Sequence, residues 1–161
     1  MDLIIPFKEV PNSAIIDTKD KRDNNILIFL VDDDELYLKA LELQFQENTG
    51  PRVKTFLTGE ACLQSINLKP DIIVLDYFLN AVNNNAIDGL ITLEKIKVAS
   101  PGIQVIMSSA YTGADVAVNC MKLGAFDYIV KNDETFLKLK QSIKKVLGIY
   151  SKEKELIVWD W

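Results

Sequence analysis

Residues 26–34 read Ile26-Leu27-Ile28-Phe29-Leu30-Val31-Asp32-Asp33-Asp34, an apolar run that ends directly in three carboxylates. A second apolar run, Ile72-Ile73-Val74-Leu75, ends directly in Asp76. Short apolar runs between polar residues are typical of strands buried on both faces, as in a parallel sheet covered by helices. Parallel strands present their carboxyl ends to one edge of the sheet, so we expect these acids to meet in one pocket. Taken singly, each motif has a plainer interpretation as a helix cap or the start of a turn.

The chain from residue 26 onward repeats a strand-helix pattern five times. Further strands are predicted at residues 53–56, 104–108 and 128–130, and helices follow each strand, the first from about Glu35 to Glu47 and the last from about Asp133. Such alternation predicts an α/β fold with a doubly wound five-stranded parallel sheet of order 2-1-3-4-5. Two helix starts are also predicted: a cap at Thr58, and a capping box at residues 112–115 before a helix that Gly124 closes.

The domain boundaries follow from changes in composition. Residues 1–25 have mixed charge and two prolines, so we interpret them as an N-terminal extension or linker, followed by one domain at 26–150. The C-terminal tail at 151–161 is too short for a DNA-binding domain. Its apolar end, 156–161, predicts docking on this domain or on a partner; a plain chain end or the start of a longer segment stay open as alternatives.

Composition excludes several function classes. The 161 residues carry a formal charge of -5, which argues against a general nucleic-acid surface, and they include no histidine. The chain therefore has no Ser-His-Asp or Cys-His catalysis, no histidine metal site and no phosphohistidine of its own. No apolar run reaches the roughly 18 residues of a membrane span, so we predict a cytoplasmic protein without membrane insertion. Cys62 and Cys120 lack metal-ligand spacing and are predicted to be reduced core thiols.

The acids at the strand ends need a compensating charge. Converging carboxylates repel each other by about 1 kcal/mol per pair in water, and by more in a cleft. A divalent cation would offset this, and a small all-oxygen set favours Mg²⁺. Lys131, after the last strand, would add a positive charge and Ser109, after the fourth, a hydroxyl donor, although each alone also reads as an ordinary surface or turn residue. Together these groups are what phosphoryl transfer requires.

The chain from Ile26 to about Leu147 resembles the receiver domain of two-component response regulators. The resemblance implies a flavodoxin-like three-layer sandwich. It rests on motifs in family order with near-family spacing, namely Val31-Asp32-Asp33-Asp34, Pro70 to Asp76, Asp88-Gly89, Ser108-Ser109-Ala110, Gly124 to Tyr128 and Ile129-Val130-Lys131.

The resemblance implies that Asp76 accepts a phosphoryl group from a histidine kinase or histidine phosphotransfer protein in a phosphorelay. It further implies that Asp32 and Asp33, with Asp76 and the backbone carbonyl of Phe78, hold Mg²⁺, and that Lys131 pairs with the phosphoryl group. A phosphoryl group adds about -1.5 to -2 charges and three acceptor oxygens, which would favour such partners.

Two further residues are implied to act as a switch. Ser109 would move to bond the phosphoryl group, and Tyr128 would change rotamer as it does. The output would be protein contacts with an unknown downstream target, without a DNA-binding domain, and the family relationship allows a homodimer through the last two helices and last strand. The chain is then not an enzyme in its own right. Phe78 and Tyr111 stand where the family tunes hydrolysis and cannot position water as an acid or amide would, so autodephosphorylation is expected to be slow.

Two alternatives and two departures from the family pattern remain. The alternatives are a non-phosphorylated pseudo-receiver acting as a binding module, and a magnesium-dependent phosphatase with an aspartyl nucleophile; the second is disfavoured because Phe78 stands where such enzymes carry a general acid. The loop at 77–88 is longer than usual, and its asparagine-rich tip is predicted to be disordered or to contact a partner. Asn132 replaces a proline that commonly follows a cis bond; we expect trans, since non-proline cis costs about 3 kcal/mol, with some shift of Lys131.

Overall fold

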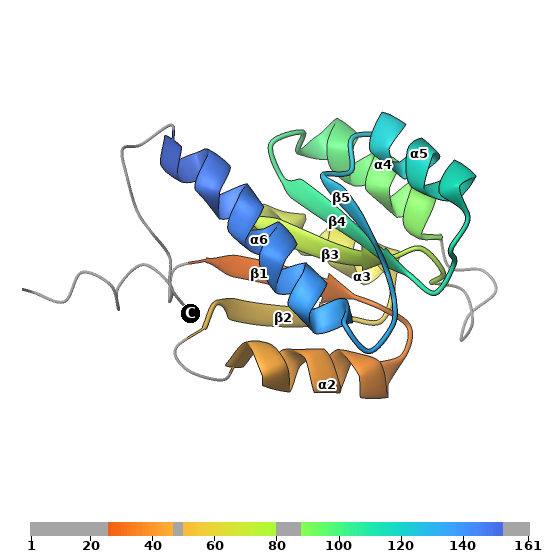
Figure 1. Cartoon of the computed structure of the whole chain (residues 1–161). Helices are drawn as coiled ribbons and strands as arrows, with labels where there is room; N and C mark the ends of the chain where they lie inside the picture. The colour runs from red at the N-terminus through yellow and green to blue at the C-terminus, as the bar shows by residue number, and fades with distance from the viewer. Residues whose placement is uncertain (1–25, 47–49, 80–87, 153–161) are drawn as a thin grey trace, which may run out of the picture.

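Five parallel strands form the centre of the computed structural model, which describes residues 26–46, 50–79 and 88–152 (Figure 1). Their order is β2-β1-β3-β4-β5, and every neighbouring pair is parallel, which confirms the predicted sheet. The strands are β1 (Leu27–Val31), β2 (Arg52–Phe56), β3 (Ile72–Asp76), β4 (Gln104–Ser109) and β5 (Asp127–Val130).

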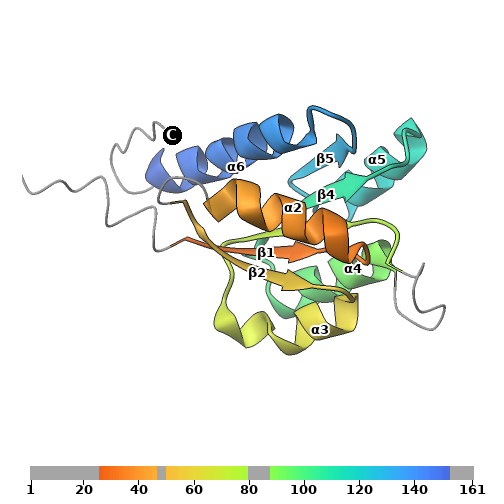
Figure 2. The same cartoon turned by 90° about the horizontal axis from the view of Figure 1, so that it is seen from below.

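Helices cover both faces of the sheet, giving the predicted three-layer sandwich (Figures 1 and 2). One face carries α2 (Glu35–Gln46) and α6 (Thr135–Lys152); the other carries α3 (Gly59–Gln64), the 3-10 turn Ile66–Leu68, α4 (Gly89–Ala99) and α5 (Ala114–Lys122).

Alternation along β1 explains why both faces bury apolar side chains. Leu27, Phe29 and Val31 join the core under α3, α4 and α5, whereas Ile28 and Leu30 join the core under α2 and α6. Successive strand residues point to opposite faces, so a run of five apolar residues supplies both cores at once. The acid that follows such a strand therefore lies at the edge of a rigid, buried element.

The predicted start of α3 and the predicted end of α5 are confirmed, whereas the predicted start of α5 is wrong. The Thr58 hydroxyl accepts a hydrogen bond from the Ala61 N–H at 3.2 Å, as a cap should. Gly124 has a φ of 95° and closes α5, its N–H donating to the Met121 carbonyl. The predicted capping box at 112–115 does not form. Gly113 is the N-cap of α5, with no side-chain cap bond, because the helix begins one residue later than Thr112 would need.

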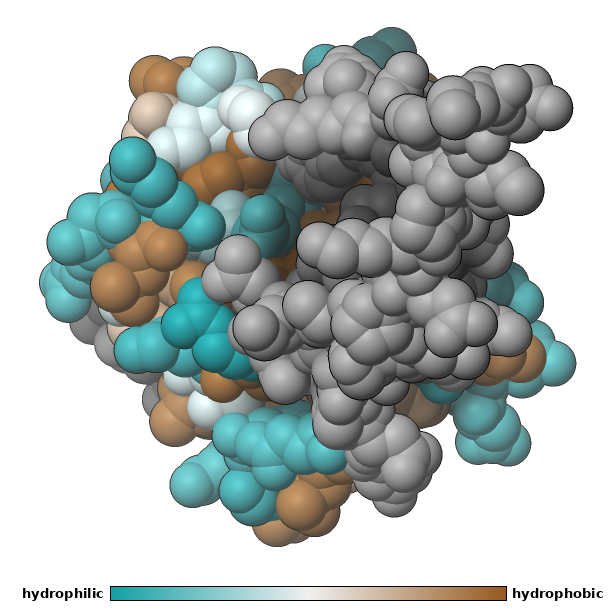
Figure 3. Space-filling model, turned by 90° about the vertical axis from the view of Figure 1, so that its left-hand side faces the viewer, coloured by the Kyte–Doolittle hydropathy of each residue, from teal (hydrophilic) through white to brown (hydrophobic). Residues whose placement is uncertain are grey.

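Both cysteines are buried and free, as predicted for core thiols. Within the described ranges no helix is long and apolar enough to cross a bilayer. The coloured surface in Figure 3 mixes hydrophilic and apolar residues, as folded proteins generally do.

Several predictions concern residues outside the described ranges. These are the N-terminal extension, the asparagine-rich loop tip at 80–87, the tail from residue 153 and the last predicted residue of the first helix, Glu47. The division between domain and tail stays a prediction, with α6 running to Lys152.

Candidate functional site

Three strands deliver charged side chains to one edge of the sheet. Asp32 directly follows β1, Asp76 ends β3 and Lys131 directly follows β5. Because strand side chains alternate, a residue two positions after a buried one points to the same face. Each charged residue comes two positions after an apolar residue in the core under α2 and α6, namely Leu30, Val74 and Ile129. This shared parity is what brings the three charges together.

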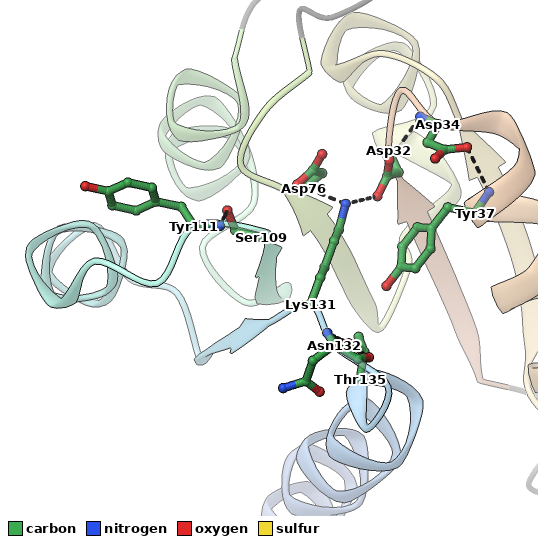
Figure 4. A network of polar contacts seen from close by, with 9 residues as sticks. All are labelled: Asp32, Asp34, Tyr37, Asp76, Ser109, Tyr111, Lys131, Asn132 and Thr135. Carbon is green, nitrogen blue, oxygen red and sulfur yellow. Dashed lines mark hydrogen bonds and ion pairs between the residues drawn. The ribbon is translucent and has the colours of Figure 1, made fainter.

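The Lys131 ammonium lies between the two acids (Figure 4). Its Nζ atom is 2.6 Å from Oδ2 of Asp32 and 3.3 Å from Oδ1 of Asp76. The carboxylates are nearly fully buried, with exposed fractions of 4% for Asp32 and 5% for Asp76. The ammonium also lies 4.6 Å from the centre of the Tyr37 ring. A single lysine thus balances two acids that would otherwise repel each other.

Burial governs the protonation of these groups. It raises the pKa of Asp76 from 3.8 to about 6, with a further contribution from the charge of Asp32 and opposing ones from Lys131 and the Phe78 backbone. Burial also raises the pKa of Asp32, partly offset by its hydrogen bond to Lys131. For Lys131, burial lowers the pKa, but the two carboxylates outweigh it, so the net change is upward. At neutral pH, Asp76 with its pKa of about 6 is therefore mostly ionised beside the Lys131 ammonium.

The acids are close enough to share a cation. Asp32, Asp33 and Asp76 each offer a carboxylate oxygen, and these oxygens lie within 4.8 Å of one another. An all-oxygen set of this size suits Mg²⁺. The residues predicted from the sequence as carboxylate ligands are thus brought together, whereas the role of the Phe78 carbonyl stays a prediction.

Asp34 belongs to the first helix rather than to the site. Its Oδ1 accepts a hydrogen bond from the Tyr37 N–H at 3.0 Å, which caps α2. Its own N–H donates to Oδ1 of Asp32 at 3.0 Å. The helix start therefore also holds one oxygen of Asp32, leaving the other to Lys131.

The predicted switch residues are linked to each other but stand apart from the acids. Ser109 comes two positions after Met107 in β4, so its side chain points to the same face as Met107, toward the core under α3, α4 and α5. Its hydroxyl accepts a hydrogen bond from the Tyr111 N–H at 3.0 Å and points away from Asp76 (Figure 4). The Tyr128 hydroxyl donates to the Tyr111 carbonyl at 2.9 Å. The backbone of Tyr111 thus connects Ser109 with Tyr128.

The segment after Lys131 is held without a proline. The described residues contain no cis peptide bond, which confirms the trans geometry expected here. The Asn132 N–H donates to the Thr135 hydroxyl at 2.6 Å, and Oδ1 of Asn132 accepts from the Glu134 N–H at 2.9 Å. The Lys131 N–H donates to the Ser109 carbonyl at 2.7 Å. These bonds let Lys131 reach both acids from a trans backbone.

Two residues at the site have no assigned role in the sequence prediction. Ser108 is the cross-strand partner of Asp76, and Tyr37 lies in the first turn of α2 beside Lys131. The only sequence signal for Ser108 is a polar residue within an otherwise apolar strand. Tyr37 carries none, because its distance from Lys131 in the sequence is bridged only by the folded sheet.

A family model for the response regulator receiver domain matches residues 28–144. The chain is similar to the transcriptional regulatory protein ZraR of Escherichia coli K12, at 32% identity over 125 residues, covering 78% of this chain and 27% of ZraR. It is also similar to protein-glutamate methylesterase/protein-glutamine glutaminase 1 of Paramagnetospirillum magneticum, at 32% identity over 124 residues, covering 74% of this chain and 31% of that protein. The chain thus spans about a quarter to a third of these relatives.

Solved structures show the same architecture. The signal receiver domain of a putative Luxo repressor protein from Vibrio parahaemolyticus aligns with a TM-score of 0.69 and 25% identity, covering 80% of this chain and 94% of that one. The BeF3-activated receiver domain of DrrB, a Thermotoga maritima protein, aligns with a TM-score of 0.63 and 30% identity, covering 76% of this chain and 97% of that one.

Proposed function

Because the chain belongs to the response regulator receiver domain family of two-component signalling, we propose that it is a phosphoacceptor whose acceptor is Asp76. The observation that carries the proposal is the buried Asp76 carboxylate with the Lys131 ammonium 3.3 Å from its Oδ1 atom. A phosphoryl group on Asp76 would therefore form next to the positive charge of Lys131.

The proposed reaction is transfer from a phosphohistidine on a histidine kinase or histidine phosphotransfer protein. An oxygen of ionised Asp76 attacks the phosphorus, an O–P bond forms and the N–P bond of the donor breaks. The donor nitrogen keeps the electron pair of that bond and takes up a proton. With a pKa of about 6, most Asp76 is ionised at neutral pH and able to attack.

The residues of this chain would divide the work. Asp32, Asp33 and Asp76, with the Phe78 carbonyl, would hold Mg²⁺, which supplies positive charge to the phosphoryl oxygens. Lys131 stabilises the added negative charge. Ser109 would move to donate a hydrogen bond to a phosphoryl oxygen. Because Ser109 and Tyr128 both bond to the backbone of Tyr111, this movement of Ser109 would be transmitted to Tyr128 at the surface.

The proposed output is protein contact rather than catalysis. A downstream target protein would bind the altered face that includes Tyr128. A second copy of the chain would be such a partner if phosphorylation drives homodimer formation. Phe78 and Tyr111 are 45% and 44% exposed beside the site and carry no group suited to activating water, which supports a slow loss of phosphate.

Intact mass measurement after incubation with Mg²⁺ and acetyl phosphate tests the proposal. We expect a single labile phosphoryl adduct on the wild type and none on Asp76→Asn. Asp133→Asn, an exposed acid near the same edge, is the matched control and should keep the adduct. The adduct should persist after the acetyl phosphate is removed, and rapid loss would contradict slow autodephosphorylation.

Other outcomes favour the alternatives. An adduct that survives in Asp76→Asn would rule out this acceptor. A wild type that gains no adduct, from acetyl phosphate or from a phosphohistidine donor, would favour a pseudo-receiver. Continuous release of phosphate from a phosphate monoester would favour a phosphatase.

A further inference from the structure

A small cavity lies directly beneath the acid cluster, on the side of α2. It measures about 10 Å³, counted as room for the centre of a water molecule. Asp32, Tyr37, Asp76 and Ser108 form its polar lining, and the rest is apolar: Leu30, Val31, Leu38, Leu41 and Val74.

Three polar atoms around this cavity are buried and lack hydrogen-bond partners within the described part of the chain. They are the Ser108 hydroxyl oxygen, the Tyr37 hydroxyl oxygen and Oδ1 of Asp76, which also lies 3.3 Å from the Lys131 ammonium in an ion pair. Ser108 is only 2% exposed and Asp76 only 5%. Buried polar atoms are nearly always hydrogen-bonded, so two buried hydroxyls without a geometric hydrogen bond, beside a carboxylate oxygen held only by an ion pair, call for a shared partner.

The fold explains why these atoms meet. Ser108 and Asp76 are aligned residues on neighbouring parallel strands, so their side chains point to the same face. Leu38 and Leu41 bury α2 against that face, which brings Tyr37 over the strand ends. Burial raises the pKa of Tyr37, and the Lys131 ammonium and a hydrogen-bonding contact with the Ser108 hydroxyl partly offset this, so the two hydroxyls are close enough to share one water.

We propose that this cavity binds one water molecule, held by Tyr37, Ser108 and Asp76, and that Tyr37 is thereby a positioning residue for Asp76. A water site needs roughly 10 to 15 Å³ and two to four polar partners, and both conditions are met here. The water would donate one hydrogen bond to Oδ1 of Asp76 and form its other hydrogen bonds with the hydroxyls of Tyr37 and Ser108.

The consequence for the site is a fixed carboxylate orientation. With Oδ1 of Asp76 bonded inward, the other oxygen is the nucleophile. The Tyr37 ring contributes separately, because it lies 4.6 Å from the Lys131 ammonium and limits where that charge can move. This second half of the inference rests on the proposed function of Asp76, whereas the water site itself does not.

A high-resolution crystal structure of the whole chain tests the water site. We expect one ordered water within hydrogen-bond distance of all three atoms in the wild type. Its loss is expected in Ser108→Val, whose added methyl groups fill the space. A wild-type cavity without ordered water would overturn the site.

Rates of adduct formation with Mg²⁺ and acetyl phosphate test the positioning role. Tyr37→Phe keeps the ring over Lys131 and removes only the hydroxyl. We expect it and Ser108→Ala each to slow adduct formation by about 3- to 10-fold, and the double variant to be no slower than the worse single one, since all lose the same water. Additive effects or a wild-type rate in Tyr37→Phe would overturn the role.

Ser142→Ala is the matched control for loss of a buried hydroxyl. Ser142 is 1% exposed, and its hydroxyl donates to Asp127 at 2.7 Å, outside the site. It should lower stability and keep the wild-type rate. If the wild type gains no adduct at all, the proposed function fails and the positioning role with it, but the crystal structure still decides the water site.

Discussion

Burial of Asp76 sets the protonation of the carboxylate that we propose as the phosphoacceptor. A carboxylate that is 5% exposed and close to Asp32 is costly to ionise, and its pKa rises to about 6 as a result. Lys131 limits that cost by lying against both acids. The Asp76 carboxylate is therefore ionised at neutral pH, but its negative charge is only partly compensated. An added positive charge would stabilise it further.

This balance predicts a pH dependence of stability in the absence of Mg²⁺. The unfolded chain has the ordinary Asp76 pKa of 3.8 and the folded chain about 6, so the folded state binds more protons between these values. Its contribution to stability is therefore full below pH 3.8 and is lost as the pH rises through 6. The loss amounts to about 3 kcal/mol, from two pKa units at about 1.4 kcal/mol each.

Asp76→Asn should remove this contribution. We expect the difference in free energy of unfolding, variant minus wild type, to grow by up to about 3 kcal/mol between pH 4 and pH 7. Urea unfolding without divalent cations measures it, with Asp133→Asn as the control for loss of one surface charge. Parallel pH profiles for the wild type and Asp76→Asn would contradict the raised pKa.

At the scale of elements, helix starts hold the site in place. Asp88 caps α4, accepting a hydrogen bond from the Ile91 N–H at 2.8 Å, and Gly89 follows it. A Cβ atom at Gly89 would collide with the carbonyl oxygen of Asp76 and the backbone of Tyr77. The Asp88-Gly89 motif therefore has a structural reason, since it lets α4 start tightly against the end of β3.

The start of α2 yields a separate test of roles. Asp34→Ala removes the side-chain cap on the Tyr37 N–H, so we expect the free energy of unfolding to fall by about 1 kcal/mol. The affinity for Mg²⁺ should stay the same, because the ligand acids remain. Urea unfolding and Mg²⁺ titration measure the two effects.

Thr58→Ala, which removes the cap of α3, is the matched control and should cost a similar amount. A large loss of Mg²⁺ affinity in Asp34→Ala, beyond that in Thr58→Ala, would place Asp34 in the site after all.

At the scale of the whole molecule, the sheet joins residues that are far apart in the chain. Asp32 and Lys131 are separated by 99 positions, yet their side chains are in contact. A ligand bound at this edge therefore contacts the ends of β1 and β3 together and stabilises the folded state as a whole.

We expect Mg²⁺ to raise the free energy of unfolding of the wild type, by about 2.7 kcal/mol at 100 times its dissociation constant. Asp32→Asn should largely lose this gain, since it removes one of the three acids. Thermal unfolding with and without MgCl₂, against NaCl of equal ionic strength, measures the gain for each protein. Equal gains in both proteins would place the cation elsewhere.

The sequence by itself determined the sheet, its order and the carboxylates of the site. Runs such as Ile26 to Val31 encode buried strands locally, and the acid after each run follows its strand to the common edge. The wrong capping box at 112–115 shows the limit of local rules, because where α5 begins is set by how the chain leaves β4.

Only the tertiary structure decided which side chains touch. Ser108 and Ser109 are adjacent in the chain, but strand alternation sends Ser108 to the cavity beneath Asp76 and Ser109 to the opposite face, toward Tyr111. Tyr37 joins the site because α2 packs its leucines against the sheet. Strand register and helix packing depend on residues remote in the chain, so the sequence predicts Lys131 at the acid edge, whereas Tyr37 and Ser108 become neighbours of Asp76 only in the folded structure.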